Sequence, residues 1–95
     1  MDVPHGQIRE FCRRHHIRRL SLFGSVLRDD FGPESDVDVL VEFDADHVPG
    51  LAFFAMQDEL SRILGRNVDL NTPGFIGRLF RDQVLSDAED LYVSG

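Results

Sequence analysis

The chain has 95 residues, of which 42% are apolar and 28% charged, a composition typical of one small globular domain. No apolar run approaches the roughly 20 residues that a membrane span needs. No apolar stretch typical of a signal peptide follows the N-terminus, so we expect a cytoplasmic protein without membrane contact. The single cysteine, Cys12, excludes an internal disulfide and a cysteine-rich zinc site.

The net charge of −7 comes from 17 acidic residues and ten basic ones, all arginine. Residues 1–19 hold five arginines against two acids, a net of +3, and residues 20–95 hold five against 15, a net of −10. Such an acidic body would repel a polyanion, which argues against direct nucleic-acid binding. The basic segment either faces a phosphate tail or an acidic partner, or forms a solvated helix face.

The N-terminal half is predicted to begin with a helix. Pro4 suits a first helical turn, and Ile8 and Phe11 follow at helical spacing, which predicts a helix over residues 4–15. The rest of this half comprises a strand over residues 17–23, a helical turn over 26–29, a turn over 31–35 and a second strand over 36–43.

The C-terminal half begins with a polar loop and a second helix. Phe53, Met56 and Leu60 recur at three and four residues, which predicts a helix over residues 51–64 with Gly65 as its left-handed cap. A third strand over residues 67–71, a helix over 75–88 and a short edge strand over 91–93 complete the chain. We therefore expect a single domain over residues 1–95 of the α/β (α+β) class, with helices packed on a small mixed sheet of three to four strands.

Three aspartates carry the first chemical signal. Asp36 and Asp38 are two residues apart on a strand, so both side chains leave one face with Cα atoms roughly 7 Å apart. Two carboxylates near 4 Å repel by about 4 kcal/mol at an effective dielectric of about 20, so they need a cation or a proton. If the third strand pairs beside the second, Asp69 joins them. Three carboxylates over two Mg²⁺ ions can clamp an in-line nucleotidyl displacement.

A turn after the first strand carries the second signal. Gly24 tolerates unusual dihedrals where the backbone must approach a ligand. Ser25 offers a hydroxyl and a backbone N–H at the start of a helical turn, a suitable anion site. Arg28 can reach the same anion as a charge-assisted donor. Phosphates at one end and metals at the other describe a nucleoside triphosphate site.

This pattern resembles the minimal nucleotidyltransferase (MNT) domain of the DNA polymerase beta superfamily. The matching segments are residues 22–25, Arg28, residues 35–43 and residues 68–70, and the resemblance covers roughly residues 18–92. It implies a polymerase-beta-type nucleotidyltransferase fold with ATP as substrate. One departure is Asp29, which stands where the family often has glycine and puts a negative charge near the expected triphosphate.

The resemblance also implies residue roles. Asp36 and Asp38 would bind two Mg²⁺ ions, and Asp69 would bind the catalytic ion and help to activate the attacking hydroxyl. Nucleotide binding would involve Gly24, Ser25, Arg28 and Ser35.

The function that the resemblance implies is that of an antitoxin. Such proteins are typically encoded beside a HEPN-family ribonuclease toxin and transfer AMP from ATP to one of its tyrosines. The alternative is a non-catalytic module that neutralises the toxin by complex formation. A small molecule as acceptor is a weaker third interpretation, because no acceptor domain is visible. The oligomeric state, with itself or with a partner, stays open.

The remaining side chains of note are expected to serve the fold or a partner surface rather than a catalytic or metal site. The four histidines, His5, His15, His16 and His47, show no zinc-ligand spacing on a shared face. Cys12, Phe53, Phe54 and Met56 are expected in the core rather than in a base-stacking platform. The apolar run over residues 75–80 is expected in the core or partly at a partner surface.

Overall fold

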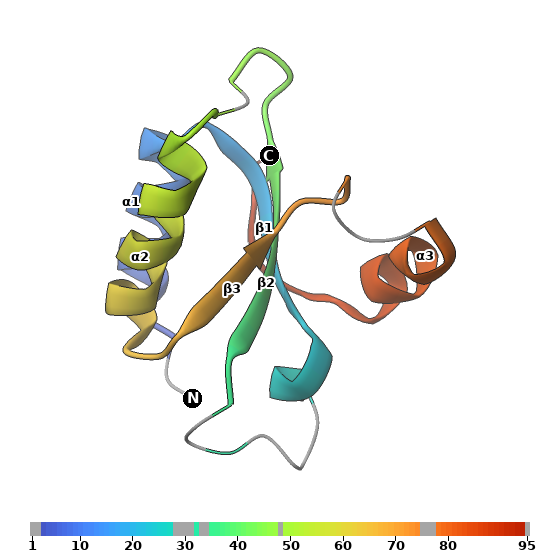
Figure 1. The fold of residues 1–95 in the computed structure, drawn as a ribbon. Coiled ribbons are helices and arrows are strands. Elements are labelled where there is room, and N and C mark those ends of the chain that lie inside the picture. The colour runs from blue at the N-terminus through green and yellow to red at the C-terminus, as the bar shows by residue number, and fades with distance from the viewer. Residues whose placement is uncertain (1–2, 28–31, 33–34, 48, 75–77, 95) are drawn as a thin grey trace.

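A four-stranded sheet with the strand order β3-β2-β1-β4 forms the centre of the computed structural model, which describes residues 3–27, 32, 35–47, 49–74 and 78–94. Helices α1 and α2 cover one face of the sheet, and α3 lies on the other side (Figure 1). The elements are α1 (His5–Arg14), β1 (Ile17–Phe23), the 3₁₀ turn η1 (Gly24–Leu27), β2 (Val37–Phe43), α2 (Ala52–Leu64), β3 (Val68–Asn71), α3 (Arg78–Asp87) and β4 (Glu89–Val93). The predicted α/β (α+β) class with a small mixed sheet is confirmed.

Most element bounds agree with the sequence prediction to within two residues. The helical turn expected over residues 26–29 begins earlier, at Gly24. The last strand begins at Glu89 rather than at residue 91, because its polar start pairs with β1 through Asp90 and Ser21. Residues 75–77 of the expected last helix lie outside the described residues. Among the described residues, no helix is both long and apolar enough to cross a membrane.

The pairing directions give the sheet its mixed character. Strand β1 lies between β2 and β4 and is antiparallel to both. Strand β3 is parallel to β2, and α2 makes the connection between them, as a parallel pair requires. The N–H groups on the outer edge of β3 are also satisfied, because Val68 donates to Ser61 Oγ and Leu70 to Gln57 Oε1, each at 3.0 Å.

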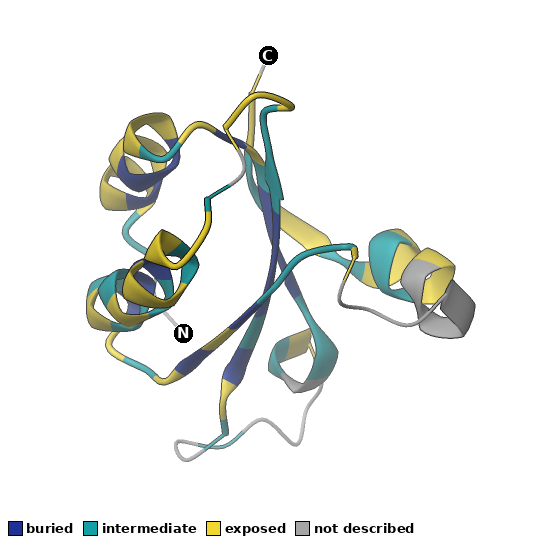
Figure 2. Ribbon diagram, turned by 45° about the horizontal axis from the view of Figure 1, so that its top comes forward, coloured by how far each residue is buried: buried dark blue, intermediate teal, exposed yellow. Residues whose placement is uncertain are grey.

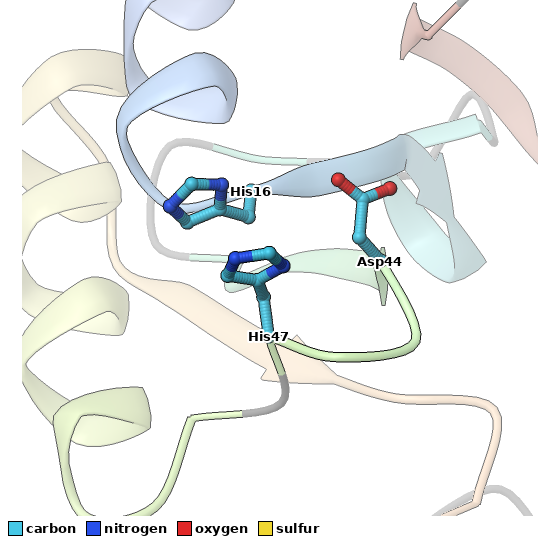
Figure 3. A group of neighbouring side chains, drawn as sticks. All are labelled: His16, Asp44 and His47. Atoms are coloured by element: carbon cyan, nitrogen blue, oxygen red, sulfur yellow. The ribbon is translucent and has the colours of Figure 1, made fainter.

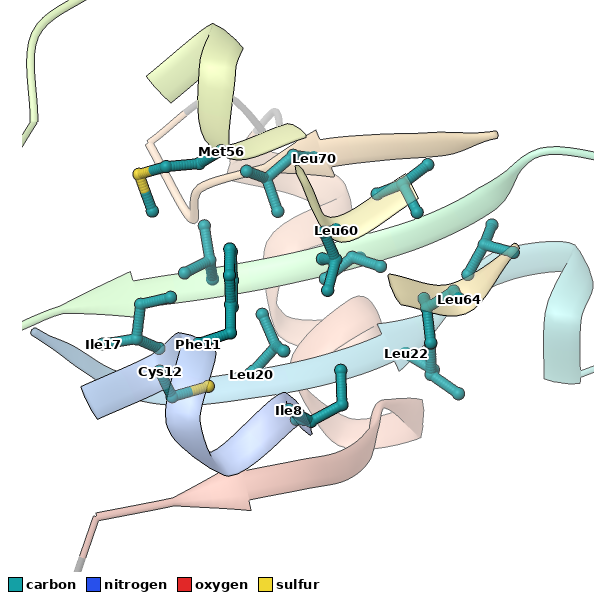
Figure 4. Close-up of a cluster of buried hydrophobic side chains, with 14 residues drawn as sticks. Ile8, Phe11, Cys12, Ile17, Leu20, Leu22, Met56, Leu60, Leu64 and Leu70 are labelled. Atoms are coloured by element: carbon teal, nitrogen blue, oxygen red, sulfur yellow. The ribbon is translucent and has the colours of Figure 1, made fainter. Parts of the chain in front are cut away.

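The core lies between the sheet and the two helices on its covered face. Its members come from the inner sides of α1 and α2 and from β1, β2 and β3 (Figures 2 and 4). Val37, Val39 and Val41 of β2 are fully buried there. Cys12 and Met56 are buried as predicted, but the expectation for Phe54 is wrong. Its side chain is 65% exposed, because it follows the partly buried Phe53 by one residue and so lies on a different side of the helix.

A polar cluster fastens β4 to β1 on the opposite face. Asp90 Oδ1 accepts hydrogen bonds from Ser21 Oγ at 2.6 Å and from Arg19 Nε at 2.8 Å. The bond from Ser21, followed by that from Arg19, lowers the pKa of Asp90 although partial burial opposes the change. Ser21 is itself fully buried, so Asp90 satisfies a hydroxyl that has little access to water.

Replacing Asp90 tests this cluster. We expect Asp90→Asn to lower the free energy of unfolding by about 1 kcal/mol at neutral pH, a small value because Asp90 is partly exposed. A lowered carboxylate pKa stabilises the fold above the usual value of 3.8, and this contribution disappears as the pH falls through the folded-state pKa. Urea unfolding at several pH values measures the difference.

Asp82→Asn, on the exposed surface of α3, serves as the control. The difference between wild type and Asp90→Asn should shrink in acid, whereas that for Asp82→Asn should stay near zero. An Asp90→Asn effect that is independent of pH would contradict the assigned charge.

Candidate functional site

Asp38 and Asp69 lie side by side on neighbouring strands. They are direct partners in the parallel pairing of β2 with β3. Paired residues share a face of the sheet, and the residues on either side of them, such as Val37 and Leu70, are buried on the helix-covered face. Both aspartates therefore leave the opposite face, where Asp69 is exposed and Asp38 half-buried.

Asp36 directly precedes β2 and is exposed. The strands come together next to it, since the Val37 N–H donates to the Asn67 carbonyl at 2.8 Å. The carboxylates are not tightly gathered, because Asp36, Asp38 and Asp69 do not form a group with all ligand atoms within 4.8 Å of one another. Mutual repulsion of three like charges favours this separation.

Gly24 packs directly against the Asp38 carboxylate. A Cβ atom at Gly24 would lie 3.2 Å from Asp38 Cγ and closer still to Asp38 Oδ2. The backbone also has a φ of 73°, in the left-handed region that favours glycine. The turn after β1 thus lies against the acidic side chain of β2, as the two sequence signals together predict.

The turn that leads into Asp36 is held by residues from two segments. The Ser35 hydroxyl accepts a hydrogen bond from the Gly32 N–H at 3.1 Å, and the Ser35 N–H donates to the Gly32 carbonyl at 3.1 Å. The Arg66 guanidinium donates to the Gly32 carbonyl and, at 3.4 Å, to that of Ser35. Sequence reasoning missed Arg66, because 31 residues separate it from Ser35 and no local pattern marks the pairing.

Two of the predicted nucleotide-binding residues are not fully described. The backbone of Ser25 lies in η1 directly after Gly24. Arg28 and the unusual Asp29 lie outside the described residues, as do residues 75–77 of the apolar run.

An apolar pocket of about 440 Å³ adjoins the acidic face at β3. Its lining residues are Phe43, Pro49, Gly50, Phe53, Phe54, Gln57, Asp69, Leu70 and Thr72. Asp69 therefore belongs both to the acidic face and to the wall of an aromatic pocket. No sequence pattern indicates this pocket, because Phe53 and Phe54 are spaced like core residues.

Acidic side chains of the fold bind part of the basic N-terminal segment. Arg14 pairs with Glu59 of α2, and Arg19 pairs with Asp90. Arg18 lies 3.7 Å from Glu42. The charge that this segment offers to a phosphate or a partner is therefore smaller than the sequence suggests.

Comparison with known proteins identifies the family of this chain. Residues 6–91 match the family model described as a nucleotidyltransferase domain. A "Putative protein adenylyltransferase" of Methanocaldococcus jannaschii is 36% identical, over 82% of this chain and 83% of that protein. The chain belongs to the nucleotidyltransferase domain family, and the resemblance to its minimal members is confirmed.

Two solved structures have folds similar to that of this chain. The "Structure of putative minimal nucleotidyltransferase" is 31% identical with a TM-score of 0.73, over 88% of this chain and 85% of that one. A tri-AMPylated Shewanella oneidensis HEPN toxin in complex with MNT antitoxin matches with a TM-score of 0.67 and 22% identity, over 95% of this chain and 70% of that one. The polymerase-beta-type fold and the expected class of enzyme, a nucleotidyltransferase, are confirmed.

A pair of glycine substitutions separates backbone strain from contact with Asp38. Gly24 and Gly65 have φ values of 73° and 67°, so alanine at either position costs about 1 kcal/mol in the free energy of unfolding. Only at Gly24 does the new methyl group meet another side chain, since nothing lies within 4 Å of a Cβ at Gly65. We expect both variants to lose stability in urea unfolding, but only Gly24→Ala to turn the Asp38 carboxylate away.

Crystal structures of the two variants measure the second effect. An unmoved Asp38 carboxylate in Gly24→Ala would contradict the close contact.

Proposed function

We propose that the protein is an antitoxin that transfers AMP from ATP to a tyrosine of a cognate HEPN-family toxin in the cytoplasm. The name of the Methanocaldococcus jannaschii relative, which points to transfer of AMP onto a protein, supports this proposal. So does the fold shared with an MNT antitoxin that was solved with its AMPylated HEPN toxin. The acidic body of the chain agrees with a protein acceptor rather than a nucleic acid.

The observation that carries the proposal is the convergence of Gly24, Asp38 and Asp69. Asp38 contacts the glycine turn and is the strand partner of Asp69. The donor set fits Mg²⁺, a hard cation that prefers carboxylate oxygens and takes further ligands from phosphates. Asp36, Asp38 and Asp69 would hold two such ions. When bound, Mg²⁺ would neutralise the triphosphate and stabilise charge that develops on its oxygens.

Residues of the chain would bind the nucleotide and accept the proton of the attacking hydroxyl. Gly24 lets the backbone of the turn lie against the Asp38 carboxylate, and the backbone N–H of Ser25 would bind the triphosphate oxygens. Arg28 and Ser35 are the further nucleotide-binding residues of the proposal. The tyrosine oxygen would form a bond to the α-phosphorus while the bond to the bridging oxygen breaks and pyrophosphate leaves. Asp69, exposed at the edge of the site, would take the hydroxyl proton.

The apolar pocket beside Asp69 supplies a place for the acceptor. Phe43, Phe53 and Phe54 offer aromatic surface on which a tyrosine ring can pack. A hydroxyl at the rim of this pocket would lie close to Asp69, which lines it. Positioning of this kind can supply about 7–11 kcal/mol of barrier lowering.

The alternative function is neutralisation of the toxin by complex formation alone. No observation on the described residues favours it over catalysis, but the two functions predict opposite results for variants that keep the fold and lose the carboxylates.

Replacing the paired aspartates tests catalysis. We expect Asp38→Asn and Asp69→Asn each to reduce AMP transfer to the toxin more than about 100-fold, because each removes a ligand or a proton acceptor. Both proteins should stay folded, since relief of like-charge repulsion favours the metal-free fold. Mass spectrometry of the toxin after incubation with ATP and Mg²⁺ measures the transfer.

Asp58→Asn, on the exposed side of α2, is the matched control and should transfer AMP normally. Equal neutralisation of the toxin by wild type and Asp38→Asn, with no added mass on tyrosine, would establish masking instead.

Replacing Phe54 tests the acceptor pocket. We expect Phe54→Ala to lower kcat/KM for the toxin about tenfold, the loss of one aromatic contact, without changing the affinity for ATP. Leu51→Ala is the control, because Leu51 is 86% exposed and does not line the pocket. An equal loss in both variants would mean that the outer surface of α2, rather than the pocket, receives the toxin.

A further inference from the structure

Two histidines and an aspartate form a cluster that the sequence does not indicate. The rings of His16 and His47 stack with centroids 3.8 Å apart and an interplanar angle of 18°. The Asp44 carboxylate lies beside them, and one ligand atom from each of the three residues falls within 4.8 Å of the others (Figure 3). The expectation that the histidines share no face is therefore wrong for His16 and His47.

The backbone holds the three side chains together. The Asp44 N–H donates to the His16 carbonyl at 2.9 Å, and the His47 N–H donates to the Asp44 carbonyl at 2.9 Å. His16 has a φ of 56°, the only positive value among the described residues other than glycine. This unusual backbone lies at the junction of α1 and β1, so the cluster joins that junction to the loop after β2.

We propose that His16, Asp44 and His47 form a binding site for a zinc-class divalent transition metal. Two imidazole nitrogens and one carboxylate oxygen are the donor set of many three-ligand zinc sites, with water in the fourth position. Imidazole ligands select such borderline ions over Mg²⁺, which prefers oxygen ligands. The rings of His16 and His47 are exposed, so they can rotate out of the stack and bring their donor atoms around one ion.

The site is separate from the aspartates of the proposed active site. Asp44 follows the C-terminal end of β2, whereas Asp36 and Asp38 lie at its N-terminal end. The six residue steps of extended chain from Asp38 to Asp44 span about 20 Å. The adjacent His15 is occupied elsewhere, since its Nε2 lies 3.0 Å from Glu59 Oε1.

Metal binding there would restrain the loop beside the apolar pocket. Pro49 and Gly50 follow His47 closely in the chain and line that pocket. An ion that joins His47 to His16 would fix the start of this loop to the first strand of the sheet. The site would thus act as a structural clamp and takes no part in the proposed transfer of AMP.

Calorimetry with Zn²⁺ tests the site directly. The protein must carry no histidine tag and be dialysed against chelator, and excess Mg²⁺ competes with Zn²⁺ for the aspartates of β2 and β3. We expect one Zn²⁺ per chain and a rise in Tm on binding. His16→Asn, which suits the left-handed backbone, and His47→Gln should each weaken binding by about tenfold or more, as even outer-shell changes do.

Matched controls come from the same chain. His5→Gln, at an exposed position of α1, and Asp46→Asn, in the same loop as Asp44, should leave Zn²⁺ affinity within twofold of wild type. Asp44→Asn should weaken it. Absence of Zn²⁺ binding by the wild-type protein would overturn the proposal. Equal affinity of wild type, His16→Asn and His47→Gln would also overturn it, whatever the activity of these proteins.

Discussion

Burial of one face of β2 is the constraint on which the rest of the structure depends. Val37, Val39 and Val41 are fully enclosed by the sheet and its helices, so period-two alternation sends Asp38 to the other face. A slip of one residue against β1 would carry Asp38 into the core, where an unpaired carboxylate costs several kcal/mol. The apolar core thus selects the register that sets out the acidic side chains, without help from any polar contact among them.

The same register places two like charges on adjacent strands. Asp38 and Asp69 oppose one another directly, an arrangement that destabilises a sheet in isolation. Gly24 adds to the cost, because its backbone adopts a positive φ and its missing side chain contributes nothing to packing. Valines and leucines on the covered face offset these costs, as is usual where a fold gives up stability to hold a functional site.

Local patterns predicted most elements and the acidic face. The alternation in β2 and the helical spacing in α1 and α2 depend only on residues that are close in the sequence. The sequence indicated that Asp38 and Asp69 could lie on adjacent strands, but the parallel direction of that pair is seen only in the structure. Long-range pairings could not be predicted in this way. Arg66 reaches Ser35 and His16 stacks on His47 across 31 residues, and no spacing rule encodes either contact. The prediction that Phe54 is buried failed for a different reason, since an apolar side chain need not be buried.

The hydrogen bonds from Val68 and Leu70 to α2 affect how the protein can meet other chains. Ser61 also donates to the Gln57 carbonyl at 2.9 Å, so both helix residues are held in place over the rim of β3. That rim has no unpaired N–H at Val68 or Leu70 to offer to an incoming strand. The opposite rim, β4, begins with the exposed acid Glu89, whose charge discourages strand addition there. Recognition by β-augmentation is thus disfavoured along β3 and at the start of β4, which favours association through side chains.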